Sequence, residues 1–193
     1  MARVLFVKES RVRGYVTVGL SDDGESASYT VSKITYSELG SPVRGSELDG
    51  FAFERLAEED ENFRALRRAL SLLSYGDNSK GALFAKLLRA GFSQSAVRHA
   101  VRECEGHGYI NEDAQLERKI TLLANEKLYG TYYIRARLMR AGYSLSLINS
   151  VLDRLVKSED VNFDLNFSSL CEKMGTETDE ERRALAYKYG YKR

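Results

Sequence analysis

Proline, cysteine, histidine and tryptophan are scarce in this sequence of 193 residues. It has one proline, two cysteines, two histidines and no tryptophan. Cys104 and Cys171 stand alone without a Cys-x-x-Cys pair, so they give neither a disulfide framework nor a zinc site. His99 and His107 lack the surroundings of a catalytic base or a metal ligand. The sequence therefore predicts a protein that is not an enzyme and that needs no metal or cofactor.

Long apolar runs and phosphate-binding loops are lacking as well. No stretch approaches eighteen uninterrupted apolar residues, so no membrane-spanning helix is expected. The patterns GxxxxGK[ST] and GxGxxG are absent, which excludes the common nucleotide-binding loops. Residues 1–8 contain too short an apolar stretch for a secretory signal. With 43% hydrophobic and 30% charged residues, the chain has the composition of a folded protein, and we expect a cytoplasmic monomer.

Residues 1–45 have the alternating pattern of β-strands. Strands are expected around residues 4–6, 15–20 and 28–31. Asp and Gly in Ser21–Gly24 predict a tight turn, because both tolerate the backbone angles of a sharp reversal. Pro42 lies between two glycines and indicates a loop that closes the segment. The front of the chain is therefore predicted to be a small antiparallel sheet.

The remainder of the chain has the three-to-four-residue apolar spacing of helices. Gly91 and Gly142 follow predicted helices, where a left-handed residue closes the last turn, and Ser93 and Ser144 are candidate N-caps of the next helices. The segment Gly106–Asp113 is interpreted as the joint between two helical units. The fold class is predicted to be mainly α, an elongated, curved array of three-helix repeats behind a small N-terminal antiparallel sheet.

An internal repeat defines those units. An offset of 51 residues places Leu88–Ser93 over Met139–Ser144 and aligns the apolar positions on both sides. A weaker third copy appears at Tyr189–Tyr191, and it is preceded by a capping-box pattern at Thr178–Glu181 that starts a helix. Since a unit of about fifty residues is too small to bury its own apolar stripe, neighbouring units should stack. We predict an extension over 1–45, a connecting helix over 46–62, repeats over 63–111 and 112–160, and an incomplete third repeat over 161–193.

Basic residues are concentrated in the middle of the chain. Residues 64–140 contain fourteen basic and seven acidic residues, whereas 47–60 and 153–181 are acidic, and the net charge of the whole chain is +1. Such segregation can steer a polyanion or an acidic protein toward one face. It is also compatible with ordinary charged helix surfaces.

Two basic positions recur in the repeat. Lys86 aligns with Arg137 and Arg89 with Arg140, and the spacing i, i+3 places both on one helix face. Further basic residues extend these positions into a predicted binding stripe, which comprises Lys86, Arg89, Arg98, Arg102, Arg118, Lys119, Arg135, Arg137, Arg140 and Lys188. A solvated helix surface would account for the same charges, so the sequence leaves both interpretations open.

Four segments resemble the RecX family of RecA regulators. They are Ala69–Ser74, Leu87–Ser93, Gly108–Asn111 and Lys127–Gly130. The resemblance covers about residues 62–193, and the strand-rich front is similar to the N-terminal extension of some members. It implies a regulator that binds the RecA–single-stranded DNA filament and suppresses its ATPase, strand-exchange and co-protease activities. RecA is then the expected partner, with weak, non-specific contact to single-stranded DNA and no cofactor.

Two alternatives remain open on the sequence. A helix, glycine turn and helix also describe a helix-turn-helix protein, with Ser93–Glu105 as the recognition helix acting directly on duplex DNA. An enzyme in the strand-rich front is disfavoured, because only Tyr15, Tyr29, Lys33 and Tyr36 could supply its chemistry.

Overall fold

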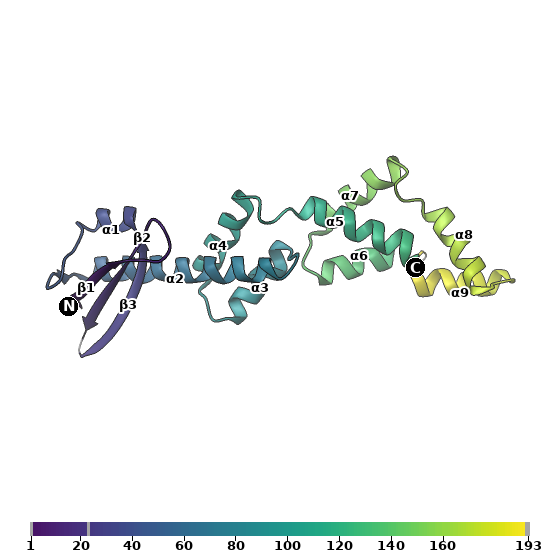
Figure 1. The fold of residues 1–193 in the computed structure, drawn as a ribbon. Coiled ribbons are helices and arrows are strands. Elements are labelled where there is room, and N and C mark those ends of the chain that lie inside the picture. The colour runs from purple at the N-terminus through teal and green to yellow at the C-terminus, as the bar shows by residue number, and fades with distance from the viewer. Residues whose placement is uncertain (1, 23, 192–193) are drawn as a thin grey trace. The chain divides into compact units, whose positions relative to one another are not determined.

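The structure is a computed structural model that describes residues 2–22 and 24–191 (Figure 1). The chain forms two compact units. Unit 1 contains the residues up to Tyr75 together with Phe84–His107, and unit 2 contains Gly76–Leu83 and the chain from Gly108 onward. The prediction of a mainly helical chain behind a small N-terminal antiparallel sheet is confirmed.

Unit 1 begins with the sheet. Its elements are β1 (Ala2–Glu9), β2 (Tyr15–Asp22), β3 (Glu25–Ser32), α1 (Lys33–Glu38), β4 (Glu47–Leu48), α2 (Gly50–Ser74) and α4 (Gln94–Gly106). The strands pair antiparallel in the order β3-β2-β1-β4. Asp23, in the predicted turn between the second and third strands, lies outside the described residues.

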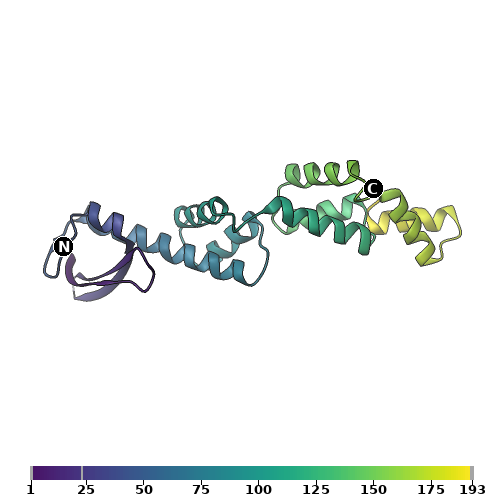
Figure 2. The same cartoon turned by 45° about the horizontal axis from the view of Figure 1, so that its top comes forward.

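The sheet buries one face against α2, as Figures 1 and 2 show. Val18 and Val31 are fully buried in a core that includes Leu56 of α2. The side chain of Asp49 caps α2 by accepting a hydrogen bond from the amide of Ala52 at 2.8 Å. Alternating strand residues and one helix stripe thus supply a common apolar core.

Helix α2 is one continuous helix of 25 residues. It runs through residue 63, where the sequence analysis places the end of the connecting helix and the start of the first repeat. Its middle is tied to the sheet by Asp60, which is 7% exposed. The Asp60 carboxylate accepts a hydrogen bond from the amide of Thr30 at 2.8 Å and pairs with Arg64 at 2.7 Å.

Unit 2 contains the remaining helices and a π-helical turn. They are α5 (Glu112–Thr121), η1 (Leu122–Glu126), α6 (Thr131–Arg140), α7 (Leu145–Lys157), α8 (Phe163–Met174) and α9 (Asp179–Tyr189), and α3 (Lys80–Arg89) begins in unit 2 and ends in unit 1. Leu116, Ile134, Leu138 and Ile148 lie in one buried core that joins α5, α6 and α7. The predicted boundaries of the three repeats stay a prediction.

The predicted helix-ending glycines and N-cap residues are confirmed. Gly91 and Gly142 have φ of +89° and +87°. Ser93 and Ser144 cap α4 and α7 by accepting hydrogen bonds from the amides three residues on. Thr178 and Glu181 form the predicted capping box of α9.

Two close backbone contacts of the same kind occur within unit 2. In each, the start of one helix packs against the glycine turn that follows a later helix. At the start of α3, a Cβ on Gly81 would lie 2.5 Å from the carbonyl oxygen of Gly142, in the turn after α6. At the start of α6, a Cβ on Gly130 would lie 2.4 Å from the carbonyl oxygen of Gly190, in the turn after α9. Glycine is needed at these positions because the backbones approach too closely for a side chain. This contact groups the first residues of α3 with unit 2.

Each docked turn is followed by a tyrosine whose hydroxyl is hydrogen-bonded; Tyr143 is buried and Tyr191 is half-buried. The hydroxyl of Tyr143 donates to the side-chain oxygen of Gln115 at 2.8 Å, and that of Tyr191 donates to the carbonyl oxygen of Leu128 at 3.1 Å. Burial raises the pKa of Tyr143 and of Tyr191 to about 12. The tyrosines occupy equivalent places after Gly142 and Gly190, but their acceptors differ, because one is a side-chain amide and the other a backbone carbonyl.

Among the described residues, no helix has the length and apolar character needed to cross a bilayer.

Candidate binding surface

The predicted binding stripe is divided between the two units. Unit 1 carries Lys86, Arg89, Arg98 and Arg102, and unit 2 carries Arg118, Lys119, Arg135, Arg137, Arg140 and Lys188. None of the ten is buried, and eight of them, all except Lys119 and Arg135, are exposed.

The basic residues of unit 1 lie on amphipathic helices. Arg98 and Arg102 are one turn apart on α4, which buries Val97 and Cys104 on its other side. Burial raises the pKa of the Cys104 thiol, so this cysteine is a core residue rather than a reactive nucleophile. The exposed side of α4 therefore presents two cations, while its buried side packs in the core of unit 1.

The last turn of α3 carries the other two cations of unit 1. Lys86 and Arg89 are exposed on either side of Leu87, which is fully buried. Cations at this end of a helix are favoured by the helix dipole. The predicted i, i+3 pair thus lies at the surface.

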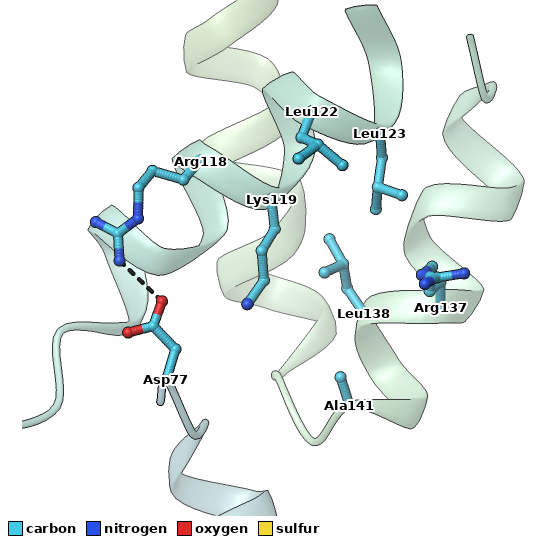
Figure 3. A pocket seen from close by; sticks show the side chains of 8 residues that line it. All are labelled: Asp77, Arg118, Lys119, Leu122, Leu123, Arg137, Leu138 and Ala141. Carbon is cyan, nitrogen blue, oxygen red and sulfur yellow. Dashed lines mark hydrogen bonds and ion pairs between the residues drawn. The ribbon is translucent and has the colours of Figure 1, made fainter. Parts of the chain in front are cut away.

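In unit 2, three residues of the stripe line one pocket of about 470 Å³. Arg118 and Lys119 come from α5, and Arg137 comes from α6 (Figure 3). The other lining residues are Asp77, Leu122, Leu123, Leu138 and Ala141. The pocket therefore combines an apolar lining with three cations and one carboxylate.

The cations of this pocket have different partners. A guanidinium nitrogen of Arg118 lies 2.9 Å from a carboxylate oxygen of Asp77, drawn as the dashed line in Figure 3. No ion pair or hydrogen bond of the Lys119 ammonium is found among the described residues, and its side chain is half-buried. Arg137 hydrogen-bonds to the hydroxyl of Tyr133. The carboxylate of Asp77 thus offsets Arg118 and leaves Lys119 and Arg137 without a counter-charge.

Next to the pocket, three tyrosines stack beside the α6 arginines. The rings of Tyr129 and Tyr133 are 3.9 Å apart and nearly parallel, and Tyr189 lies 5.7 Å from Tyr129. Hydrogen bonds from Tyr129 and Arg137, together with the positive charges of Arg137 and Arg140, lower the pKa of Tyr133. The sequence analysis missed this cluster, although Tyr129, Tyr133 and Arg137 follow one another at four-residue spacing.

Three stripe residues of unit 2 do not line the pocket, namely Arg135, Arg140 and Lys188. Arg135 donates a hydrogen bond from Nε to the side-chain oxygen of Asn149 at 2.8 Å, which links α6 to α7. Lys188 is exposed in the last turn of α9. Within unit 2, the structure thus groups Arg118, Lys119 and Arg137 and gives Arg135 a packing role.

Asp77 and the leucines of the pocket were missed by sequence reasoning. Asp77 lies in the short connection before α3, 41 residues from Arg118. Leu122 is 43% exposed, whereas Leu138 is 2% exposed. The sequence shows two apolar residues at helical spacing, but it does not show that their side chains border the same cavity.

Comparison with known proteins identifies the family. The regulatory protein RecX of Legionella pneumophila (strain Corby) is 34% identical over 102 residues, which are 53% of this chain and 67% of that protein. A second RecX from Legionella pneumophila matches to the same extent. The chain belongs to the RecX family. No family model matches the chain.

Solved RecX structures have the same fold. A crystal structure of regulatory protein RecX superposes with a TM-score of 0.68 at 20% identity and covers 95% of this chain and 89% of that one. RecX from Lactobacillus salivarius gives a TM-score of 0.54 at 15% identity, with 65% and 82% covered. The first match extends over nearly the whole chain, so the N-terminal sheet and the helical repeats both belong to a known RecX fold. The Legionella relatives and the first of these structures carry the name regulatory protein RecX, which agrees with the prediction from the sequence that this chain is a regulator.

Proposed function

We propose that this chain binds the RecA–single-stranded DNA filament and lowers its ATPase, strand-exchange and co-protease activities. Membership of the RecX family supports a regulatory role. The proposal assigns no chemical step to the protein.

The observation that carries the proposal is the surplus of exposed cations without acidic partners. One stripe residue, Arg118, forms an ion pair with Asp77. Among the described residues, no ion pair is found for five others that lie near the surface, which are Arg89, Arg98 and Arg102 in unit 1 and Lys119 and Lys188 in unit 2. Unpaired cations are free to meet phosphates or the carboxylates of an acidic protein surface. They would raise the rate of association as well as the affinity.

Regulation then follows from differential binding. A protein that binds one state of a filament more tightly than another shifts the population by that difference in affinity and by no more. Inhibition should therefore rise with the ratio of this protein to RecA and saturate, and it should weaken with salt, because the contacts are between surface charges.

The direct test is RecA ATPase on single-stranded DNA with increasing amounts of this protein. The expected result is a dose-dependent fall in turnover that is weaker at higher ionic strength. Unchanged turnover at saturating protein, with binding to the filament verified by co-sedimentation, would contradict the proposal.

The helix-turn-helix alternative is disfavoured by the start of α4. Base contacts in that motif come mainly from the N-terminal residues of the recognition helix. Here the carboxylate of Glu61 accepts hydrogen bonds from the amide and hydroxyl of Ser93, at 2.8 and 2.6 Å. Partial burial would raise the pKa of Glu61, but these bonds outweigh it and lower the pKa, so a negative charge stands where DNA would enter. A gel shift on duplex DNA without RecA separates the two functions.

A further inference from the structure

We infer that the pocket of unit 2 binds an acidic, apolar peptide segment of a partner protein, with one leucine-sized side chain against its apolar lining and carboxylates on Lys119 and Arg137. This inference rests on the proposed function and deepens it, because it states the chemistry of the partner segment. The pocket is lined by Asp77, Arg118, Lys119, Leu122, Leu123, Arg137, Leu138 and Ala141.

The charge of the pocket selects an anion. The three cations exceed the single carboxylate, and the ion pair between Arg118 and Asp77 leaves Lys119 and Arg137 as the available positive groups. In the view of Figure 3, Leu138 stands between the Lys119 and Arg137 side chains. An anionic ligand that contacts both cations would therefore also lie against the apolar lining of the pocket.

The apolar lining of the pocket favours a ligand that also carries an apolar side chain. Leu122, Leu123, Leu138 and Ala141 supply half of the lining residues. Leu122 is 43% exposed, so a side chain seated there would remove apolar surface from water. A volume of about 470 Å³ lies in the usual range of ligand pockets and is large enough for a bulky aliphatic side chain.

The same features argue for a peptide rather than a nucleic acid. Single-stranded nucleic acid is typically held by aromatic rings on which its bases stack. No aromatic side chain lines the pocket itself, and the neighbouring rings of Tyr129 and Tyr133 are stacked on each other. The Asp77 carboxylate at the pocket would also repel a phosphodiester chain that runs past Arg118. An acidic peptide can place its carboxylates on Lys119 and Arg137 and turn its apolar side chains toward the leucines.

The test uses the full chain and a fluorescent peptide of alternating leucine and aspartate, with binding followed by anisotropy and mapped by amide chemical shifts. Two comparison peptides replace every aspartate by asparagine or every leucine by serine, and an oligothymidylate represents nucleic acid. We expect the leucine–aspartate peptide to bind with shifts around Leu122 and Ala141. Both comparison peptides should bind at least about tenfold more weakly, because one lacks the charge and the other the apolar contact.

Variants of exposed or half-exposed residues locate the binding without disturbing the core. Lys119→Glu should weaken peptide binding by about tenfold or more, and Leu122→Ser should weaken it without altering the charge. Lys173→Glu, which makes the same charge change on α8, is the matched control and should bind normally. Circular dichroism verifies that each variant is folded.

Three outcomes would overturn the inference. They are the absence of shifts at the pocket at millimolar peptide, equal weakening by Lys119→Glu and Lys173→Glu, and displacement of the peptide from the pocket by oligothymidylate at lower concentration. Each leaves the RecA ATPase result standing. Conversely, unchanged RecA turnover together with pocket binding would refute the proposed function alone.

Discussion

Leu138 and Arg140 are two residues apart on α6 and lie in opposite environments. Leu138 is 2% exposed within the core of α5, α6 and α7, whereas Arg140 is exposed. Leu138→Ala should therefore lower the free energy of unfolding by about 2–5 kcal/mol through lost contacts and a residual cavity. Arg140→Ala should change it by no more than about 0.5 kcal/mol. Urea unfolding of both variants measures the difference, and similar losses would contradict the placement of Leu138 in the core.

Tyr143 and Tyr191 are expected to make the stability of the protein sensitive to alkaline pH. The pKa of Tyr143 and of Tyr191 is about 12 in the folded protein and about 10 in an unfolded chain. Above about pH 10 the unfolded chain loses these protons first, so stability is complete below that pH and falls as the pH rises toward 12. Melting temperatures measured between pH 9 and 12 should decline steeply.

Substitution identifies the tyrosine responsible. Tyr143→Phe should melt at a lower temperature at neutral pH, because Gln115 loses its hydrogen-bond partner, and its decline above pH 10 should be shallower. Tyr187→Phe is the matched control, since Tyr187 is 72% exposed. An equally steep decline in both variants would show that Tyr143 is not a source of the pH dependence.

At the scale of elements, a comparison of the two glycine turns distinguishes the cost of a left-handed backbone from the cost of a steric clash with a neighbouring helix. Gly91 and Gly142 have nearly the same positive φ, so alanine at either position costs about 1–2 kcal/mol. A Cβ at Gly91 would meet nothing within 4 Å, whereas one at Gly142 would lie 2.7 Å from the backbone nitrogen of Ala82. Gly142→Ala should therefore destabilise the protein by about 1–3 kcal/mol more than Gly91→Ala. Equal free energies of unfolding for the two variants would contradict the docking of the Gly142 turn against the start of α3.

Sequence reasoning predicted those elements that depend on neighbouring residues. The left-handed glycines at 91 and 142 and the serine caps at 93 and 144 are fixed by backbone angles and by side chains three residues away. The docking of Gly142 against Gly81 was not predicted, because it depends on contacts across about sixty residues. For the same reason, the continuity of α2 through residue 63 could not be inferred from an offset between repeats.

At the scale of the whole molecule, the sequence predicted the composition of the candidate surface but not its local geometry. The concentration of basic residues in the middle of the chain and the internal repeat identified the ten cations. The pairing of Arg118 with Asp77, the hydrogen bond of Arg135 to Asn149 and the pocket beside Lys119 all depend on three-dimensional neighbours. A linear pattern therefore indicates which side chains are available for binding, while the fold decides which of them are already engaged.

The proposed regulation should depend on the position of the cations rather than on total charge. Replacing Lys86, Arg89, Arg137 and Arg140 together by Ala should preserve folding, because all four are exposed, and should sharply reduce inhibition of RecA ATPase. The matched control replaces Arg11, Arg13, Arg44 and Lys173, four exposed cations outside the stripe, and makes the same change in net charge. We expect it to inhibit like the unaltered protein. Equal loss of inhibition in both variants would mean that overall charge, and not the stripe, attracts the filament.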